Sequence, residues 1–305
     1  MLKFKTKVLT FILLLLTVVI GYCSLADGNT DPFYLRFTTK KQKNLILGTS
    51  RAAQGLQPQV FKSVLKTNLF NYAFTETQSP YGKIYYQSII KKHSKEKGGI
   101  AVLTIDPWSV SSNCSNPNDS TLFRENNLCL HNTPFVNLNP NIFYLFNNLK
   151  GNYINIIKPP TNKMYLHKNG WLEINNVPMD NLSNLNRINR KIKTCKEIML
   201  PSTKFSSFRF NYLLKTINYL KKYGKVYLVR LPIHAKMMEI ENKLSPNFYN
   251  KIKPAIDQAD GYLDLTIYNK KFKYTDGNHL YKTSGAEVST IIANWIKNKK
   301  INDLK

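Results

Sequence analysis

Three residues from opposite ends of the chain carry side chains suited to nucleophilic catalysis. Ser50 closes the short turn 48–50, and Asp276 and His279 belong to the polar stretch 274–280. His279 follows Asp276 by three positions, so one loop can hold both, with the carboxylate on one imidazole nitrogen and the serine on the other. This arrangement would make Ser50 a nucleophile, His279 its base and Asp276 the group that orients the base.

Each of these residues also fits a simpler structural role. Ser50 alone fits a helix N-cap, Asp276 followed by Gly277 fits a turn, and His279 alone fits a surface or capping residue. The presence of both blocks in one chain favours the catalytic interpretation.

The elements that would position these residues follow from the hydrophobic pattern. Apolar runs predict five buried strands, at 44–48, 68–74, 99–105, 225–231 and 262–265. Apolar residues at helical spacing predict intervening helices, at 51–65, 84–92, 210–223, 248–259 and 284–297. Such alternation is typical of an α/β fold with a mainly parallel sheet. Ser50 would then lie at the carboxyl edge of the sheet, where ligands bind.

Residues 108–207 break the alternation. This stretch is rich in asparagine and turn residues, with a hairpin expected around 171–177. We therefore predict one domain, 44–305, that carries a long insertion at about 108–207.

The two polar blocks resemble those of the SGNH (GDSL-type) hydrolase superfamily. A Gly-x-Ser block follows the first predicted strand, an Asp-x-x-His-Leu block lies near the C-terminus, and the resemblance spans 44–296. It implies a flavodoxin-like three-layer sandwich with Ser50 as nucleophile, His279 as base and Asp276 as its orienter. Ser50-Arg51, together with an N-terminal anchor, is similar to membrane-anchored proteins of cell-envelope acyl transfer.

The chain departs from the superfamily pattern at two places. Thr49 replaces the aspartate of Gly-Asp-Ser, and residues 105–108 stand where a Gly-x-Asn-Asp block would supply a side-chain oxyanion donor. Asn71, at the end of the second strand, and the backbone near Gly82 are the candidate replacements for that donor.

The first 26 residues are typical of an export or anchor segment. Three lysines within 1–7 precede 8–26, which carries no charge. As a helix this run would span roughly 28 Å, close to the hydrocarbon core of a bilayer. The lysines favour a cytoplasmic N-terminus, which places the domain outside the cytoplasm after a linker at 27–43. Small residues at Ser24 and Ala26 leave cleavage after Ala26, and a secreted or periplasmic product, as an alternative.

The net charge indicates which partners the protein can bind. The sequence has 44 Lys and Arg against 18 Asp and Glu, a net charge of +26, which suits anionic lipid or acidic glycan. Export makes nucleic acid an unsuitable partner.

Cys114 and Cys129 bracket a polar loop and suggest a disulfide, with buried thiols as the alternative. The cysteine and histidine residues are not spaced as they are in zinc sites, and we expect neither a metal nor a cofactor.

These features predict an extracytoplasmic serine esterase or O-acyltransferase acting on acyl esters of cell-surface glycans. Its partners would be the glycan or a small acyl ester, and a membrane protein of acyl transfer. A lipase-like esterase would instead need a wide apolar groove near Ser50. The main alternative is a non-catalytic protein of the same fold that binds an anionic glycan or a membrane partner.

Overall fold

The centre of the fold is a five-stranded parallel sheet. It belongs to a computed structural model that describes residues 2–158 and 164–302. The strands, in spatial order, are β2 (Phe70–Asn71), β1 (Leu45–Leu47), β3 (Gly99–Thr104), β8 (Gly224–Arg230) and β9 (Gly261–Asp264). With the strands renumbered within this sheet, the order is the 2-1-3-4-5 of flavodoxin-like folds. All five predicted strands are confirmed, and with them the α/β fold class.

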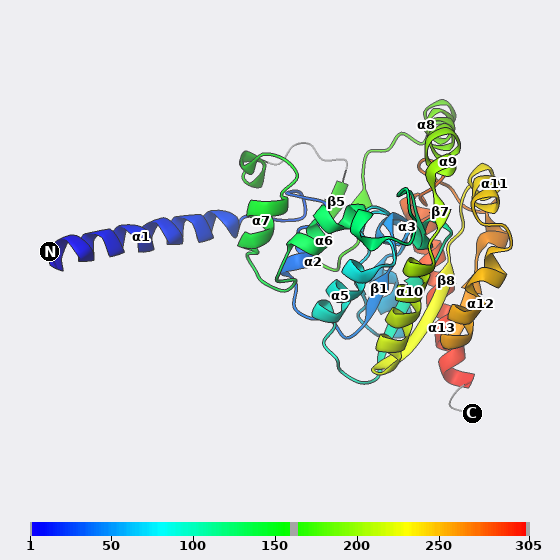
Figure 1. Cartoon of the computed structure of the whole chain (residues 1–305), viewed down its shortest axis with the longest axis horizontal. Coiled ribbons are helices and arrows are strands. Elements are labelled where there is room, and N and C mark those ends of the chain that lie inside the picture. Colours follow the sequence, from blue (N-terminus) through cyan, green and yellow to red (C-terminus); the bar gives the residue numbers. More distant parts are fainter. Residues whose placement is uncertain (1, 159–163, 303–305) are drawn as a thin grey trace.

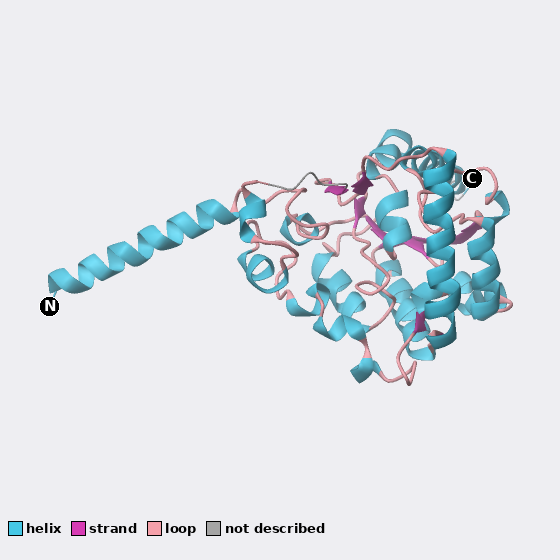
Figure 2. Ribbon diagram, turned by 90° about the horizontal axis from the view of Figure 1, so that it is seen from above, coloured by secondary structure: helices cyan, strands magenta, loops and turns pink. Residues whose placement is uncertain are grey.

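Helices cover both faces of the sheet, because successive strand residues point to opposite sides. Leu45 and Leu47 of β1 face one hydrophobic core, and Ile46 faces the other. The first core also contains residues of α5 (Lys83–Lys92), α10 (Ser207–Lys221) and α12 (Phe248–Gln258). The second contains residues of α3 (Ser50–Gly55), α4 (Pro58–Leu65) and α13 (Lys282–Asn302). The result is a three-layer sandwich (Figures 1 and 2).

The helix predicted at 51–65 is two helices. Gln57 is extended, with φ −104° and ψ 106°, and Pro58 begins α4. A residue before proline disfavours the helical conformation, so the chain turns between α3 and α4. A further helix that the sequence pattern did not indicate, α11 (Ala235–Leu244), follows β8.

The insertion leaves the sheet after β3 and returns at α10. In the part of it that the structure describes, no residue adds a strand to the central sheet. Its elements are η1 (Trp108–Val110), β4 (Ser111–Ser112), η2 (Ser120–Leu122), η3 (Arg124–Asn127), α6 (Cys129–Asn132), α7 (Ile142–Asn148), η4 (Tyr153–Ile156), β5 (Met164–Leu166), β6 (Leu172–Ile174), α8 (Asn181–Thr194), η5 (Cys195–Met199), α9 (Leu200–Ser202) and β7 (Lys204–Phe205). The hairpin is β5–β6, earlier than predicted, because its turn lies at Gly170, whose φ is 85°.

The segment 27–43 is not a linker, and that prediction is wrong. It contains α2 (Leu35–Thr38), and Phe33, Tyr34 and Phe37 are buried in the first core. The guanidinium of Arg36 is fully buried and donates to the backbone carbonyls of Pro32, Asn71 and Gly170 at 2.6–3.1 Å. The segment is therefore an integral part of the domain.

The N-terminal helix α1 (Leu2–Cys23) stands out from the rest of the molecule as a single rod (Figure 1). The helical segment 3–23 is long enough and apolar enough to cross a membrane. Only the end of α1 touches the domain: Cys23 is buried, and the Tyr22 hydroxyl donates to the Tyr153 carbonyl at 2.6 Å.

The predicted disulfide is also wrong, because both cysteines are free thiols. The Cys129 thiol is buried and donates to the side-chain oxygen of Gln78 at 3.2 Å. The Cys114 thiol donates instead to the Leu122 carbonyl at 3.0 Å. The intervening loop folds into η2 and η3 and directs the two sulfurs to different surroundings.

Candidate active site

The turn after β1 fixes the position of Ser50. Gly48 has φ 141°, and a Cβ there would lie 1.9 Å from the Thr104 hydroxyl, so only glycine fits. Its N–H donates to the Tyr85 hydroxyl at 3.1 Å, and its carbonyl accepts from the Ser79 hydroxyl at 2.7 Å. Ser50 then begins α3 at the carboxyl edge of the sheet, with its side chain partly exposed.

Ser50, His279 and Asp276 form one chain of hydrogen bonds. The Nε2 of His279 lies 2.8 Å from the Oγ of Ser50. Its Nδ1 lies 2.9 Å and 3.0 Å from the two carboxylate oxygens of Asp276. The three predicted residues thus come together with the serine and the carboxylate on opposite nitrogens of the imidazole.

The loop between β9 and α13 holds the histidine by its own backbone bonds. The Asp276 Oδ1 accepts from the N–H groups of Asn278 and His279 at 3.0 Å and 2.9 Å. The Thr275 N–H donates to the His279 carbonyl at 2.9 Å, and the His234 N–H donates to the Gly277 carbonyl at 3.2 Å. The imidazole is therefore oriented before any ligand arrives.

Asp276 stays ionised in this loop. Burial alone would raise the pKa of its carboxyl, but the charge and hydrogen bond of His279 and two backbone N–H groups outweigh burial and lower it. A carboxyl whose pKa is lower in the folded than in the unfolded state stabilises the fold above its unfolded pKa, about 4. That stabilisation is lost as the pH falls.

We expect Asp276→Asn to weaken the acid sensitivity of folding. The free energy of unfolding of the wild type should fall more between pH 5 and pH 3 than that of Asp276→Asn, because only the wild type must protonate this carboxylate. Urea titrations at fixed pH values measure the difference. Equal pH dependence of the two proteins would contradict the assignment.

Arg51 links the serine helix to the histidine loop. Its Nε and Nη2 donate to the Oδ1 of Asn278 at 3.0 Å and 2.6 Å. Its Nη1 pairs with Glu241 at 2.6 Å and faces Asp106 at 3.6 Å. Burial disfavours the charge on Arg51, but the two carboxylates outweigh it and raise the pKa of the guanidinium. Arg51 thus fixes the loop that carries His279 relative to Ser50.

The sequence reasoning did not assign roles to Asn278 or Glu241. Asn278 stands inside the recognised Asp-x-x-His block, so its position was a signal that could have been used. Glu241 lies on α11 and gives no such signal, because only the folded chain brings it to Arg51.

A narrow crevice of about 20 Å³ opens at Ser50. Its walls include Thr49, Asp106 and Trp108 after the strands, and Lys191, Cys195 and Met199 from α8 and η5. The insertion therefore covers the site. Among the described residues around Ser50 there is no wide apolar groove of the kind that a lipase-like esterase needs.

Neither candidate oxyanion donor has the predicted position. The Nδ2 of Asn71 donates to the carbonyls of Ala52 and Leu56 at 2.8 Å and 2.9 Å, so both its N–H groups are used inside the fold. Gly82 precedes α5 beside the Glu125–Arg209 ion pair, and it does not line the crevice. The prediction for both residues is wrong, and the role of Asn71 is to hold α3 against β2.

Asn71→Ala should therefore act on stability. It would remove the side-chain hydrogen bond from the carbonyls of Ala52 and Leu56, of which Ala52 keeps its bond from the Leu56 N–H, and lower the free energy of unfolding by about 3 kcal/mol. Urea unfolding measures that loss. A full-stability Asn71→Ala protein with a severely reduced acylation rate would restore Asn71 as an oxyanion donor.

Asp106 and three large aromatic residues, Tyr81, Trp108 and Trp171, are buried. Asp106 accepts from the Ser109 N–H at 2.9 Å, as a turn-forming aspartate does, and it also lines the crevice. Tyr81 and Trp171 donate to the carbonyls of Thr104 and Gln54, while Trp108 lines the crevice.

Fold and geometry define a site of one class: a Ser-His-Asp arrangement at the carboxyl edge of a parallel α/β sheet. In residues 2–158 and 164–302 no cluster of three His, Cys, Asp or Glu side chains could hold a metal ion. No protein-family model matches the sequence, and comparison with curated proteins found no match.

Proposed function

We propose that this protein is an extracytoplasmic serine esterase or O-acyltransferase acting on acyl esters of cell-surface glycans. The observation that carries the proposal is the hydrogen-bonded chain from the Ser50 Oγ through His279 to Asp276, with a separation of 2.8 Å at the serine. A partly exposed serine at that distance from an oriented imidazole is suited to catalysis.

The reaction begins when His279 takes the proton of Ser50 as the Oγ attacks the ester carbonyl carbon. The tetrahedral intermediate collapses, the bond to the alcohol breaks, and His279 gives its proton to the departing alcohol. Ser50 now carries the acyl group as an ester. Water or a sugar hydroxyl then attacks that ester, with His279 again as base, and Ser50 is regenerated.

The developing oxyanion needs donors close to Ser50. Ser50 is the first residue of α3, and backbone N–H groups in the first turn of a helix have no intrahelical partner. The Ser50 N–H is therefore our candidate for the main donor, in place of a side-chain amide.

The location is proposed from α1 and its flanking charge. Three lysines precede the apolar helix, which favours retention of the N-terminus in the cytoplasm and a domain outside it. A membrane protein that delivers the acyl group would fit this arrangement, and the net charge of +26 suits an anionic cell surface.

The proposal is tested by mass spectrometry of the intact full-length protein after incubation with p-nitrophenyl acetate. We expect one acetyl adduct on the wild type, none on Ser50→Ala, and release of p-nitrophenol in a burst equal to the enzyme concentration. Identical spectra for the two proteins would reject the nucleophile and favour a non-catalytic protein that binds an anionic glycan or a membrane partner.

A further inference from the structure

A second cavity adjoins the crevice at Ser50. This outer pocket, of about 270 Å³, shares Glu76 and Met199 with the crevice, so the two cavities meet at those side chains. Most of its other walls come from the insertion, among them Ser112, Arg124 and Ser202. A molecule that reaches Ser50 can therefore extend into it.

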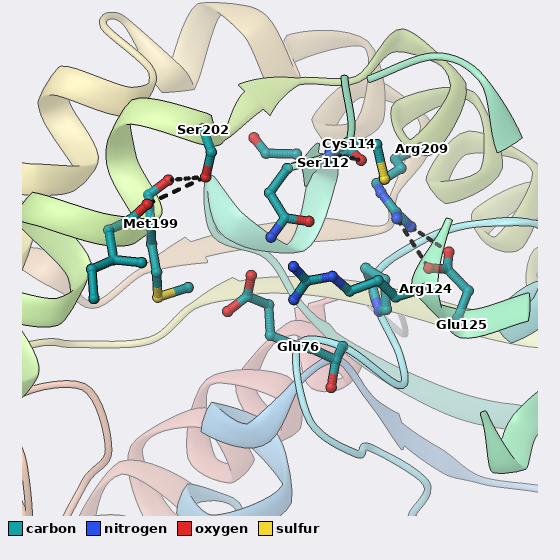
Figure 3. Close-up of a pocket in the computed structure, with 13 residues that line it drawn as sticks. Glu76, Ser112, Cys114, Arg124, Glu125, Met199, Ser202 and Arg209 are labelled. Atoms are coloured by element: carbon teal, nitrogen blue, oxygen red, sulfur yellow. Dashed lines mark hydrogen bonds and ion pairs between the residues drawn. The ribbon is translucent and has the colours of Figure 1, made fainter. Parts of the chain in front are cut away.

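Two charged side chains of the outer pocket have no partner within the described part of the chain. Glu76 and Arg124 form no hydrogen bond or ion pair with a described residue, and Figure 3 shows them pointing into the pocket and toward each other. Glu125 and Arg209, in contrast, are buried and bonded at 2.6 Å and 3.1 Å. That pair forms a fixed wall, while Glu76 and Arg124 are available to a ligand.

The lining suits a sugar. Glu76 accepts hydrogen bonds, Arg124 donates them, and Ser112, Ser202 and Asn113 do both. Pro80 and Ile198 add small apolar surfaces, which can contact the C–H groups of a sugar ring. A long alkyl chain is unsuitable here, because it would remove charged groups from water without replacing their hydrogen bonds.

We propose that the outer pocket binds the hydroxyl-bearing sugar unit of the substrate, with Glu76 accepting from its hydroxyls and Arg124 donating to them. The acyl group is then bound at Ser50, where the narrow crevice leaves room for a short chain only. This assignment rests on the proposed function and adds the part of the site that binds the sugar.

The test uses partially O-acetylated xylotriose as the probe. Calorimetry on the Ser50→Ala protein measures binding without turnover. Adding Glu76→Ala or Arg124→Ala should weaken binding about tenfold each, since each removes hydrogen bonds to a charged group. Adding Glu239→Ala or Arg190→Ala, which change exposed residues outside both cavities, should not weaken it.

The outcomes separate the two proposals. No binding to Ser50→Ala, or binding unaffected by Glu76→Ala and Arg124→Ala, overturns the outer pocket as a sugar site. Binding that these variants weaken, combined with a wild type that forms no acetyl adduct, upholds the pocket and rejects the esterase.

A separate observation concerns the surface around α7. Most exposed large apolar side chains of the described domain outside α1 are scattered, but seven lie within 23 consecutive positions. This α7 patch consists of Phe135, Leu138, Phe143, Phe146, Tyr153, Ile154 and Ile157, each at least 40% exposed. Phe135 and Phe143 have ring centroids 5.2 Å apart, and Phe146 and Tyr153 have theirs 6.1 Å apart. Exposed apolar side chains concentrated in one segment in this way are typical of an interaction site.

The position of the patch indicates its partner. The end of α1 contacts the patch through Tyr22, whose hydroxyl donates to the Tyr153 carbonyl, and Figure 1 shows α7 beside that end. Lys150 and Lys158 are exposed in the same segment. Aromatic side chains next to lysines are typical of the headgroup region of a bilayer.

We infer that the α7 patch lies in the headgroup region of the same bilayer that α1 crosses. The domain would then contact the membrane surface directly, and its orientation relative to the bilayer would be restricted. This inference depends on α1 as a membrane helix and not on the catalytic proposal.

Tryptophan quenching by brominated lipid tests the contact. The full-length Phe146→Trp protein is reconstituted in phosphatidylcholine and phosphatidylglycerol vesicles, and its fluorescence is compared with that of the wild type. We expect the added tryptophan to be quenched. The control is Leu182→Trp at an exposed position of α8, a helix that Figure 1 shows far from α1, and its added tryptophan should not be quenched. Equal quenching at the two positions, or none at Phe146→Trp, would overturn the inference.

Discussion

His279→Ala is expected to slow acetylation of Ser50 by roughly 10³- to 10⁴-fold. The variant removes the only imidazole within hydrogen-bonding distance of the serine hydroxyl among the described residues, at 2.8 Å. A neutral serine hydroxyl is a weak nucleophile, so the loss falls on the bond-forming step. Asp276 would be left with no base to orient.

The measurement is the pre-steady-state burst of p-nitrophenol at pH 7.5. Addition of free imidazole should restore part of the rate to His279→Ala, because imidazole can enter the vacated position, whereas it should not act on Ser50→Ala. His131→Ala, which changes an exposed histidine on α6, serves as the matched control and should react like the wild type. A His279→Ala protein that acetylates at the wild-type rate would remove the basis for a triad.

Glu241→Gln is expected to lower the free energy of unfolding by about 3–5 kcal/mol, the range for breaking a buried ion pair from one side. Glu241 is 1% exposed, and it forms ion pairs with Arg51 at 2.6 Å and with Arg230 at 3.2 Å. Its loss leaves two buried guanidinium groups with only more distant carboxylates, Asp106 at 3.6 Å and Asp264 at 3.9 Å.

Urea unfolding followed by circular dichroism measures this loss. Glu239→Gln is the matched control, since it makes the same chemical change on the exposed side of the same helix and should alter stability by less than about 0.5 kcal/mol. Because Arg51 also holds Asn278 beside His279, Glu241→Gln should slow acylation as well. Equal stabilities of the two variants would contradict the prediction and would show that other groups compensate the charges of Arg51 and Arg230.

The parts of the fold that depend on local pattern were predictable. The β-branched run 99–105 and the run 225–231 carry their strand signal within a few residues, and the alternation with helices fixes a parallel sheet. The approach of Ser50 to His279 then follows, because strand ends of a parallel sheet share one edge.

The parts that depend on distant partners were not predictable. The segment 27–43 looks polar, but the charge of Arg36 is satisfied by carbonyls from β2 and the β5–β6 turn, which no local pattern reveals. Asn71 looks like a free donor at a strand end until α3 presents carbonyls to it. The spacing of Cys114 and Cys129 likewise carries no information on where η2 and η3 direct each sulfur.

The junction between α1 and the domain bears on when the N-terminus could be removed. Cys23 is buried, Ala26 packs against the first core, and the N–H groups of Leu25 and Ala26 donate to the carbonyls of Tyr22 and Cys23. A protease needs a locally extended chain, and this hydrogen-bonded turn does not offer one once the domain has folded, although Leu25 is 57% exposed. Under the proposed export, processing after Ala26 therefore has to precede folding, and a domain that folds first keeps α1 attached.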